Sequence, residues 1–245
     1  MRVLRIGVAA AAMAGALGHA QMPGQGISVN RDNRTIAITA TDSVITEADV
    51  ATVHVGFITY GADHDTTYAS GSKVSNAIVS ALKGAGVPAD AIESVGQNLR
   101  AVQPYERQNF TDAEKAERHF VLDQTWTVRA NAADAAKVLD VAVKAGANQS
   151  GQIDWSLKDE NTPQVEAAGR ALQHARTVAE EMARGLNVKL GVLIYASNTT
   201  QAEEVRPVMA LMSRAVDAAP PPAPLAINPR QIRKSATVYA VFAIE

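Results

Sequence analysis

The amino-acid sequence predicts an α+β fold in which a twisted, largely antiparallel sheet is covered by about three helices, in two fused strand–helix lobes. Three observations support this prediction. Several segments alternate apolar and polar residues, as half-buried strands do. Other segments repeat apolar residues at steps of three and four, as amphipathic helices do. Units of strand and helix recur along the chain, although no internal sequence repeat accompanies them.

The first twenty residues are typical of an export signal. Two arginines precede an apolar run over residues 6–17, and small residues occupy the two positions that a signal peptidase reads before a cut after Ala20. The sequence therefore predicts a signal peptide over residues 1–20, followed by a flexible lead-in over residues 21–33. An uncleaved membrane anchor is the alternative, but the apolar run is shorter than the ~20 residues that span a bilayer.

The composition excludes several classes of protein. The 245 residues include no cysteine, which excludes disulfide scaffolds, iron–sulfur proteins, thiol enzymes and cysteine-anchored lipoproteins. The 23 Lys and Arg residues nearly balance the 25 Asp and Glu residues, so there is no basic field for nucleic acid. No later segment is apolar over a membrane-spanning length. We therefore expect a periplasmic protein with no nucleic-acid partner and no transmembrane segment after signal cleavage.

The domain over residues 34–245 is expected to open with two strands and a helix. Alternating apolar residues predict strands at residues 36–38 and 53–57. Apolar residues over 74–85 follow helical spacing, and glycines and a proline at residues 84–88 end the pattern.

A strand pair and a short helix are predicted next. The strands cover residues 95–105 and 120–130, and the charged segment 106–118 is predicted to be the loop between them. Asn131 is predicted to cap a short helix through residues 138–143, its side chain accepting from free amide groups.

The clearest periodic signal lies between residues 162 and 186. Thr162 as a cap and Pro163 in the first turn predict the start of a long helix. Seven apolar residues at alternating steps of three and four predict its buried face: Val165, Ala168, Leu172, Ala175, Ala179, Met182 and Leu186. Beside them, alanines at every fourth position from Ala167 to Ala183 would let the helix pack closely on a sheet.

The remaining segments are short strands and one long connection. Strands are predicted over residues 153–157, 190–196 and 237–244, the last tying the chain end into the sheet. Residues 200–230 contain a run of prolines and no sustained period, which predicts a Pro-rich excursion. Its apolar residues are a candidate interaction surface, with packing onto their own domain as the alternative: Met209, Leu211 and Met212.

Ser70 and Lys73 have the S-x-x-K spacing of some acyl-transfer enzymes, in which a lysine one helical turn away activates the serine. Ser80 and Lys83 repeat that spacing on the same predicted helix, and the companion S-D-N motif is absent. We expect no catalytic residues and keep Ser70 with Lys73 as the alternative.

A small-ligand or metal site around His54, His64 and Asp65 is a further alternative. The histidines have none of the close ligand spacings of metal-binding motifs. The sequence therefore predicts neither a metal nor a cofactor.

Short motifs spread over the chain carry a family resemblance. They are Val-Leu-Asp at 138–140, Ala-Gly-Ala-Asn at 145–148, Ile153 and Trp155, the row of alanines from Ala167 to Ala183 and Leu-Gly-Val at 190–192, with Asp49, Ala51, Pro104 and Tyr105 upstream and Pro229 before the closing strand. Together they resemble the SIMPL-domain family of exported bacterial proteins, over nearly all of the chain that follows the signal. The resemblance implies an envelope-associated or periplasmic protein, linked to oxidative-stress defence and to homo-oligomeric assembly, with no catalytic residues to carry over.

The first functional hypothesis is therefore a non-catalytic envelope protein that acts by self-assembly or by binding another envelope protein. The export signal, the long Pro-rich excursion and the lack of a catalytic motif favour it.

Overall fold

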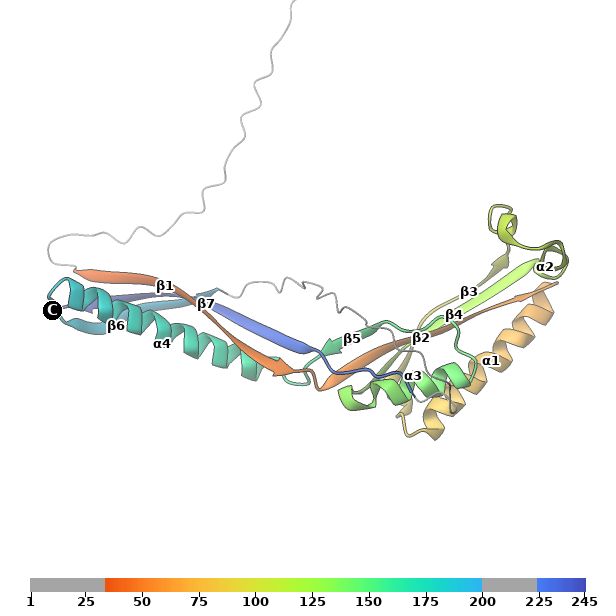
Figure 1. Ribbon diagram of the computed structural model, residues 1–245, viewed down its shortest axis with the longest axis horizontal. Helices are drawn as coiled ribbons and strands as arrows, with labels where there is room; N and C mark the ends of the chain where they lie inside the picture. The colour runs from red at the N-terminus through yellow and green to blue at the C-terminus, as the bar shows by residue number, and fades with distance from the viewer. Residues whose placement is uncertain (1–33, 200–223) are drawn as a thin grey trace, which may run out of the picture.

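The computed structural model describes residues 34–199 and 224–245 and confirms the α+β fold in two lobes (Figure 1). Three single turns of 3₁₀ helix accompany the regular elements. The helices and strands are β1 (Thr35–Glu47), β2 (Val50–Gly61), α1 (His64–Gly84), β3 (Ile92–Ala101), α2 (Asp112–Glu117), β4 (Phe120–Asn131), α3 (Ala135–Lys144), β5 (Ile153–Ser156), α4 (Asn161–Gly185), β6 (Leu190–Thr199) and β7 (Gln231–Ile244).

Each lobe consists of one antiparallel sheet and the helices that cover it. The α4 lobe has three strands in the order β1-β7-β6, with α4 packed on β1 and β7. The α1 lobe has four strands in the order β3-β4-β2-β5, covered by α1 and α3. Figure 1 shows the two lobes end to end in an elongated molecule, and only Ala48 and Asp49 separate β1 from β2.

Close packing of α4 on its sheet makes the core of the α4 lobe. Five alanines at every fourth position are buried and meet side chains such as Ile38 and Phe242: Ala167, Ala171, Ala175, Ala179 and Ala183. Because alanine has almost no side chain, it allows a helix to approach a sheet closely. The predicted row of small residues is therefore the buried face of the helix.

The apolar stripe predicted for the same helix is wrong at three positions. Val165, Met182 and Leu186 are exposed, although Ala175 and Ala179 of the same stripe are buried. The face that meets the sheet is centred on the row of alanines, and larger apolar side chains at these three positions lie outside that contact.

The core of the α1 lobe is built from larger side chains. Phe57 and Trp126 lie with ring centroids 5.9 Å apart, and Ile78 of α1 is fully buried in the same cluster. α1 approaches β4 at Gly71, where a Cβ atom would overlap Cδ2 of Leu122. A glycine at this position therefore permits the close approach of helix and sheet.

A small apolar cluster joins the two lobes. Ala48, Leu157 and Ile232 are buried together at the point where β1 gives way to β2. The Asp49 carboxylate accepts a hydrogen bond of 2.7 Å from the amide of Lys158, and the amide of Ala48 donates to the carbonyl of Arg230. These contacts tie the junction between β1 and β2 to the segment before α4 and to the segment before β7.

Two predicted helix caps are wrong. The N-cap residue of α4 is Glu160 and not Thr162, which lies in the first turn; the carboxylate of Asp159 accepts from the amides of Asn161 and Thr162 and from the Thr162 hydroxyl. These hydrogen bonds, chiefly those from Thr162, lower the pKa of Asp159. The Asn131 side chain caps no helix, because its amide nitrogen donates to the Asp134 carboxylate at 3.1 Å.

Several predictions lie outside the described residues. These are the signal peptide at 1–20, the lead-in at 21–33 and the candidate surface of Met209, Leu211 and Met212. Of the Pro-rich excursion, the structure describes residues 224–230, which have no regular secondary structure. Among the described residues, no helix combines the length and the hydropathy that crossing a bilayer requires.

Candidate interaction site

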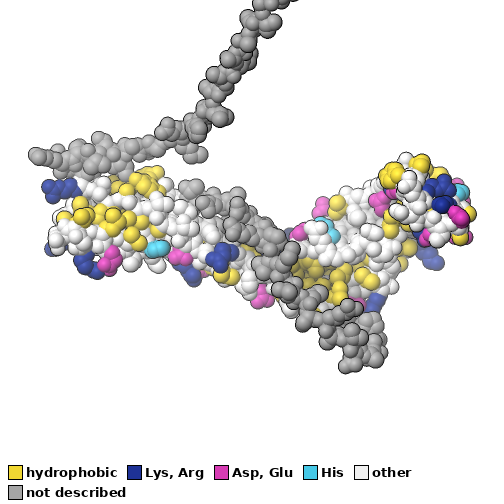
Figure 2. Space-filling model, turned by 45° about the horizontal axis from the view of Figure 1, so that its top comes forward, with side chains coloured by type: hydrophobic (Ala, Val, Ile, Leu, Met, Phe, Trp, Pro, Cys, Tyr) yellow, Lys and Arg dark blue, Asp and Glu magenta, His cyan; other side chains and the backbone are white. Residues whose placement is uncertain are grey.

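Strand β6 is an edge strand with unusually exposed apolar side chains. Among the residues that the structure describes, it pairs with β7 alone, and Leu190 is its one side chain that packs against the core cluster of the α4 lobe. The exposed fractions in its centre are 72% for Val192, 44% for Leu193, 56% for Ile194 and 49% for Tyr195. Figure 2 shows hydrophobic side chains gathered on this lobe, at the left of the view. Within residues 34–199 and 224–245, β6 therefore presents both an unpaired backbone edge and exposed apolar side chains.

The sequence of β6 lacks the features that keep an edge strand from pairing. Residues 190–199 contain no charged residue and no proline. Such residues at a sheet edge prevent a further strand from adding to it. The opposite edge of the same sheet, β1, does carry charged residues, Asp42 and Glu47. Of the two edges, β6 is the one suited to accept another strand.

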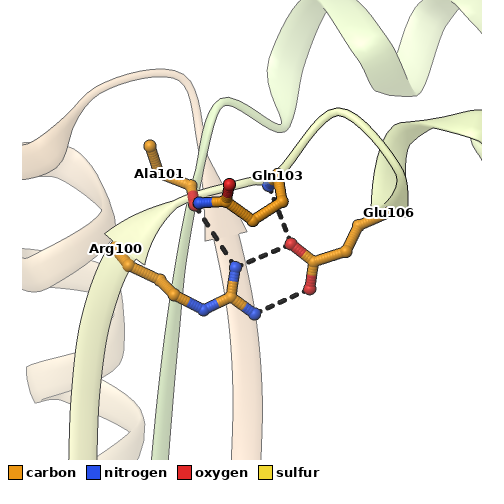
Figure 3. A network of polar contacts seen from close by, with 4 residues as sticks. All are labelled: Arg100, Ala101, Gln103 and Glu106. Carbon is orange, nitrogen blue, oxygen red and sulfur yellow. Dashed lines mark hydrogen bonds and ion pairs between the residues drawn. The ribbon is translucent and has the colours of Figure 1, made fainter. Parts of the chain in front are cut away.

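The far end of the α1 lobe is an ordered tip, residues 102–119, where the sequence predicts the end of a strand up to residue 105 and a loop over 106–118. Arg100 binds Glu106 through two hydrogen bonds of 2.6 Å each, and the amide of Gln103 donates to the same carboxylate at 2.8 Å (Figure 3). The hydrogen bonds from Arg100 are the main reason that the pKa of Glu106 is lowered to about 2. This network fixes the chain as it leaves β3.

Helix α2 is the second ordered part of the tip, and it corrects the prediction of a loop over residues 106–118. A capping box starts it, because Thr111 and Glu114 each bind the other's backbone amide. Arg118 lies over the rings of Tyr60 and Phe110, 5.0 and 5.1 Å from their centroids, and pairs with Glu114 at 2.9 Å. Arg118 and Glu114 are thus paired with each other within the tip.

The Arg100–Glu106 pair should make the order of the tip dependent on pH. The stabilisation is complete above about pH 4.5, the ordinary pKa of the carboxyl group, and is lost as the pH falls towards 2. We expect the ¹³C resonance of the Glu106 carboxyl group to titrate near pH 2, and the Arg100→Gln variant to move this midpoint towards 4.5. Trypsin should cleave the tip several-fold faster in Glu106→Gln, but not in the control Glu117→Gln; equal rates would contradict the prediction.

Ser70 and Lys73 lie one turn apart on α1, and both are exposed. Within the described part of the chain, no hydrogen bond joins them. The structure therefore places the predicted serine–lysine pair on an open helix surface.

The structure does not bring together the residues of the alternative metal site. His54 lies within β2 and its Nε2 atom is 2.6 Å from Oδ2 of Asp154 in β5, which lowers the pKa of that carboxyl group. His64 and Asp65 lie in the first turn of α1, with Nδ1 and Oδ1 3.1 Å apart. Among residues 34–199 and 224–245, no three His, Asp or Glu side chains could hold a metal ion.

Sequence reasoning predicts β6 as a strand but misses its exposure. An uninterrupted apolar run such as residues 190–196 normally indicates a strand buried on both faces. The available signal was the absence of any charge or proline on a strand that ends in a Pro-rich segment. For the tip, the T-x-x-E spacing of Thr111 and Glu114 was a readable sign of a helix start.

Comparison with known proteins extends this description. Residues 36–242 match the family model SIMPL, a protein of unknown function (DUF541). The 26 kDa periplasmic immunogenic protein of Brucella melitensis is 24% identical over 213 residues, which cover 86% of this chain and 84% of that protein. The protein of the same name from Brucella abortus strain S19 is 23% identical over the same shares of both chains. Since the family model spans both lobes, the chain belongs to the SIMPL family.

Proposed function

We propose that this chain is a non-catalytic protein of the periplasm, and that it acts by associating with further copies of itself through β6. The observation that carries the proposal is the uncharged, apolar edge of β6. Antiparallel pairing of two β6 strands about a two-fold axis would satisfy the free backbone groups of both and cover the exposed side chains. The periplasmic location is supported by the features of the first twenty residues and by the names of the two Brucella relatives.

A second copy is favoured over a different partner because the edge is self-complementary. The exposed residues of β6 are neutral, so two such strands meet without repulsion between charges. In the described part of the chain the sheet of the α4 lobe has three strands, and α4 packs chiefly on β1 and β7, leaving the centre of β6 exposed. Pairing would make a sheet of six strands across the two copies. We further propose that the assembly serves in oxidative-stress defence, as the family resemblance implies.

The test is the mass of the purified protein, measured by light scattering and sedimentation. We expect an oligomer for the natural sequence, and at least about tenfold weaker association for Ile194→Lys, because pairing would bury the new charge. Val143→Lys is the matched control. Val143, like Ile194, is an exposed β-branched residue, but it lies on α3 in the other lobe. This control should associate normally.

Two results would contradict the proposal. The first is a natural protein that stays monomeric at high concentration. The second is an Ile194→Lys variant that keeps its oligomeric mass. If residues 200–223 of the same chain cover β6 instead, Ile194→Lys lowers the stability of a monomer and leaves its mass unchanged, which also overturns the proposal.

A further inference from the structure

A groove of about 400 Å³ runs between α1 and the edge strand β3. This volume is in the range of ~300–1,000 Å³ that is typical of small-molecule sites. The floor is the sheet face under α1: Gln97 pairs with Gln124 and Leu99 with Leu122, so these four side chains lie on one face. Tyr68, Ser72 and Ser75 of α1 form the opposite wall.

The groove is lined by polar and apolar side chains together; His64 and Asn98 are among the polar ones, and no Asp, Glu, Lys or Arg lines it. Among the described residues, the side chains of Tyr68, Ser75, Gln97 and Gln124 have no hydrogen-bond partner. Hydroxyl and amide groups can each donate and accept hydrogen bonds. The groove therefore offers several unused polar groups of both kinds, and it lacks the fixed charges that would recognise a phosphate or a carboxylate.

Apolar surface lies beside these polar groups. Tyr68 is 60% exposed, and Leu99 and Leu122 form the apolar part of the floor. A tyrosine ring combines an apolar face with a polar tip. A sugar has the matching combination, with hydroxyl groups around the rim of a ring whose faces carry C–H groups.

From this lining we infer that the groove binds an uncharged saccharide, with a ring over Tyr68 and its hydroxyl or acetamido groups on the serines and glutamines. The inference goes beyond the proposed association through β6, because it concerns the other lobe. A peptide strand added to β3 is the competing ligand. It is disfavoured because a bulge between Ser94 and Gly96 interrupts the edge of β3, and bulged edges pair poorly.

The test uses the purified full chain and saturation-transfer NMR, which observes the ligand. Chitotriose and cellotriose are the probes, since the first carries acetamido groups and the second only hydroxyl groups, and trigalacturonate is the charged control. We expect one or both neutral sugars to bind and the charged one not to bind. Binding of chitotriose alone would identify the acetamido group as the recognised feature.

Variants then locate the site. Tyr68→Ala should weaken binding at least about tenfold, whereas Tyr68→Phe, which keeps the ring, should retain most of it. Gln97→Ala should also weaken it. Tyr105→Ala is the matched control, because Tyr105 is an exposed tyrosine outside the groove, and it should bind as the natural chain does. Thermal unfolding of each variant checks that the fold is intact.

The inference is overturned if neither neutral sugar binds, or if Tyr68→Ala and Tyr105→Ala bind equally well. It is also overturned if a neutral five-residue strand peptide binds the groove and the sugars do not. The outcome is separable from that of the β6 proposal, because Ile194→Lys should bind the sugars with unchanged affinity whether or not it alters the oligomeric mass.

Discussion

Replacing Phe57 by alanine should lower the free energy of unfolding of the α1 lobe by about 3–5 kcal/mol. Phe57 is 1% exposed and is among the largest of the fully buried side chains. Its ring packs against Trp126, and α1 approaches it at Gly71. Deleting the ring loses this apolar burial and leaves a cavity that α1 and the sheet can only partly close.

The measurement is urea unfolding followed by tryptophan fluorescence. Both tryptophans of the chain, Trp126 and Trp155, lie in strands of the α1 lobe, so the signal reports on that lobe. The control is Tyr105→Ala, which removes an exposed ring and should change the free energy by no more than about 0.5 kcal/mol. A loss below about 1 kcal/mol for Phe57→Ala would mean that the core does not depend on this ring.

Replacing Ala175 by leucine should destabilise the α4 lobe by about 1–3 kcal/mol or more, because overpacking forces a helix away from its sheet. Ala175 is fully buried at the centre of the row of alanines that meets β1 and β7. Leucine adds three carbon atoms at this fully buried position, and we expect α4 to move outward to accommodate them.

Circular dichroism at 222 nm follows the unfolding of this variant, because α4 is the longest helix among the described residues. His174→Leu introduces the same side chain one position earlier, where the residue is exposed, and should change the free energy by no more than about 0.5 kcal/mol. Equal stability of the two leucine variants would contradict the prediction. It would show that the contact between α4 and the sheet can accommodate a larger side chain at position 175.

The behaviour of α4 explains one limit of sequence reasoning. Its helical period is clear, and the bounds predicted from it differ from the observed Asn161–Gly185 by a single residue at each end. The buried face is harder to predict, because a search for hydrophobic residues favours Val165, Met182 and Leu186 over alanine. When a helix packs closely on a sheet, small size matters more than hydrophobic area. The row of alanines at every fourth position was therefore the better guide.

The strands also show that a local pattern predicts secondary structure, whereas burial depends on how distant elements pack. β2 alternates because one of its faces meets α1 and α3, so its period and its burial agree. β6 is apolar without being buried, and its exposure depends on the order of strands in the sheet and on the position of α4. A single sequence carries no direct record of either. The groove beside α1 was missed for a similar reason, since Tyr68 and Gln97 come together only when α1 lies across the sheet.

The elongated shape has a geometric consequence for any pair of copies joined through β6. β6 lies in the α4 lobe, at one end of the molecule, and the tip that contains α2 lies at the other (Figure 1). Antiparallel pairing of two edge strands turns the second copy end for end. The two tips would then point away from each other at the extremes of a rod, with the saccharide grooves spaced between each tip and the shared centre. The length of such a rod would depend on the junction at Ala48 and Asp49, where the apolar cluster and the hydrogen bond of Asp49 hold the two lobes end to end.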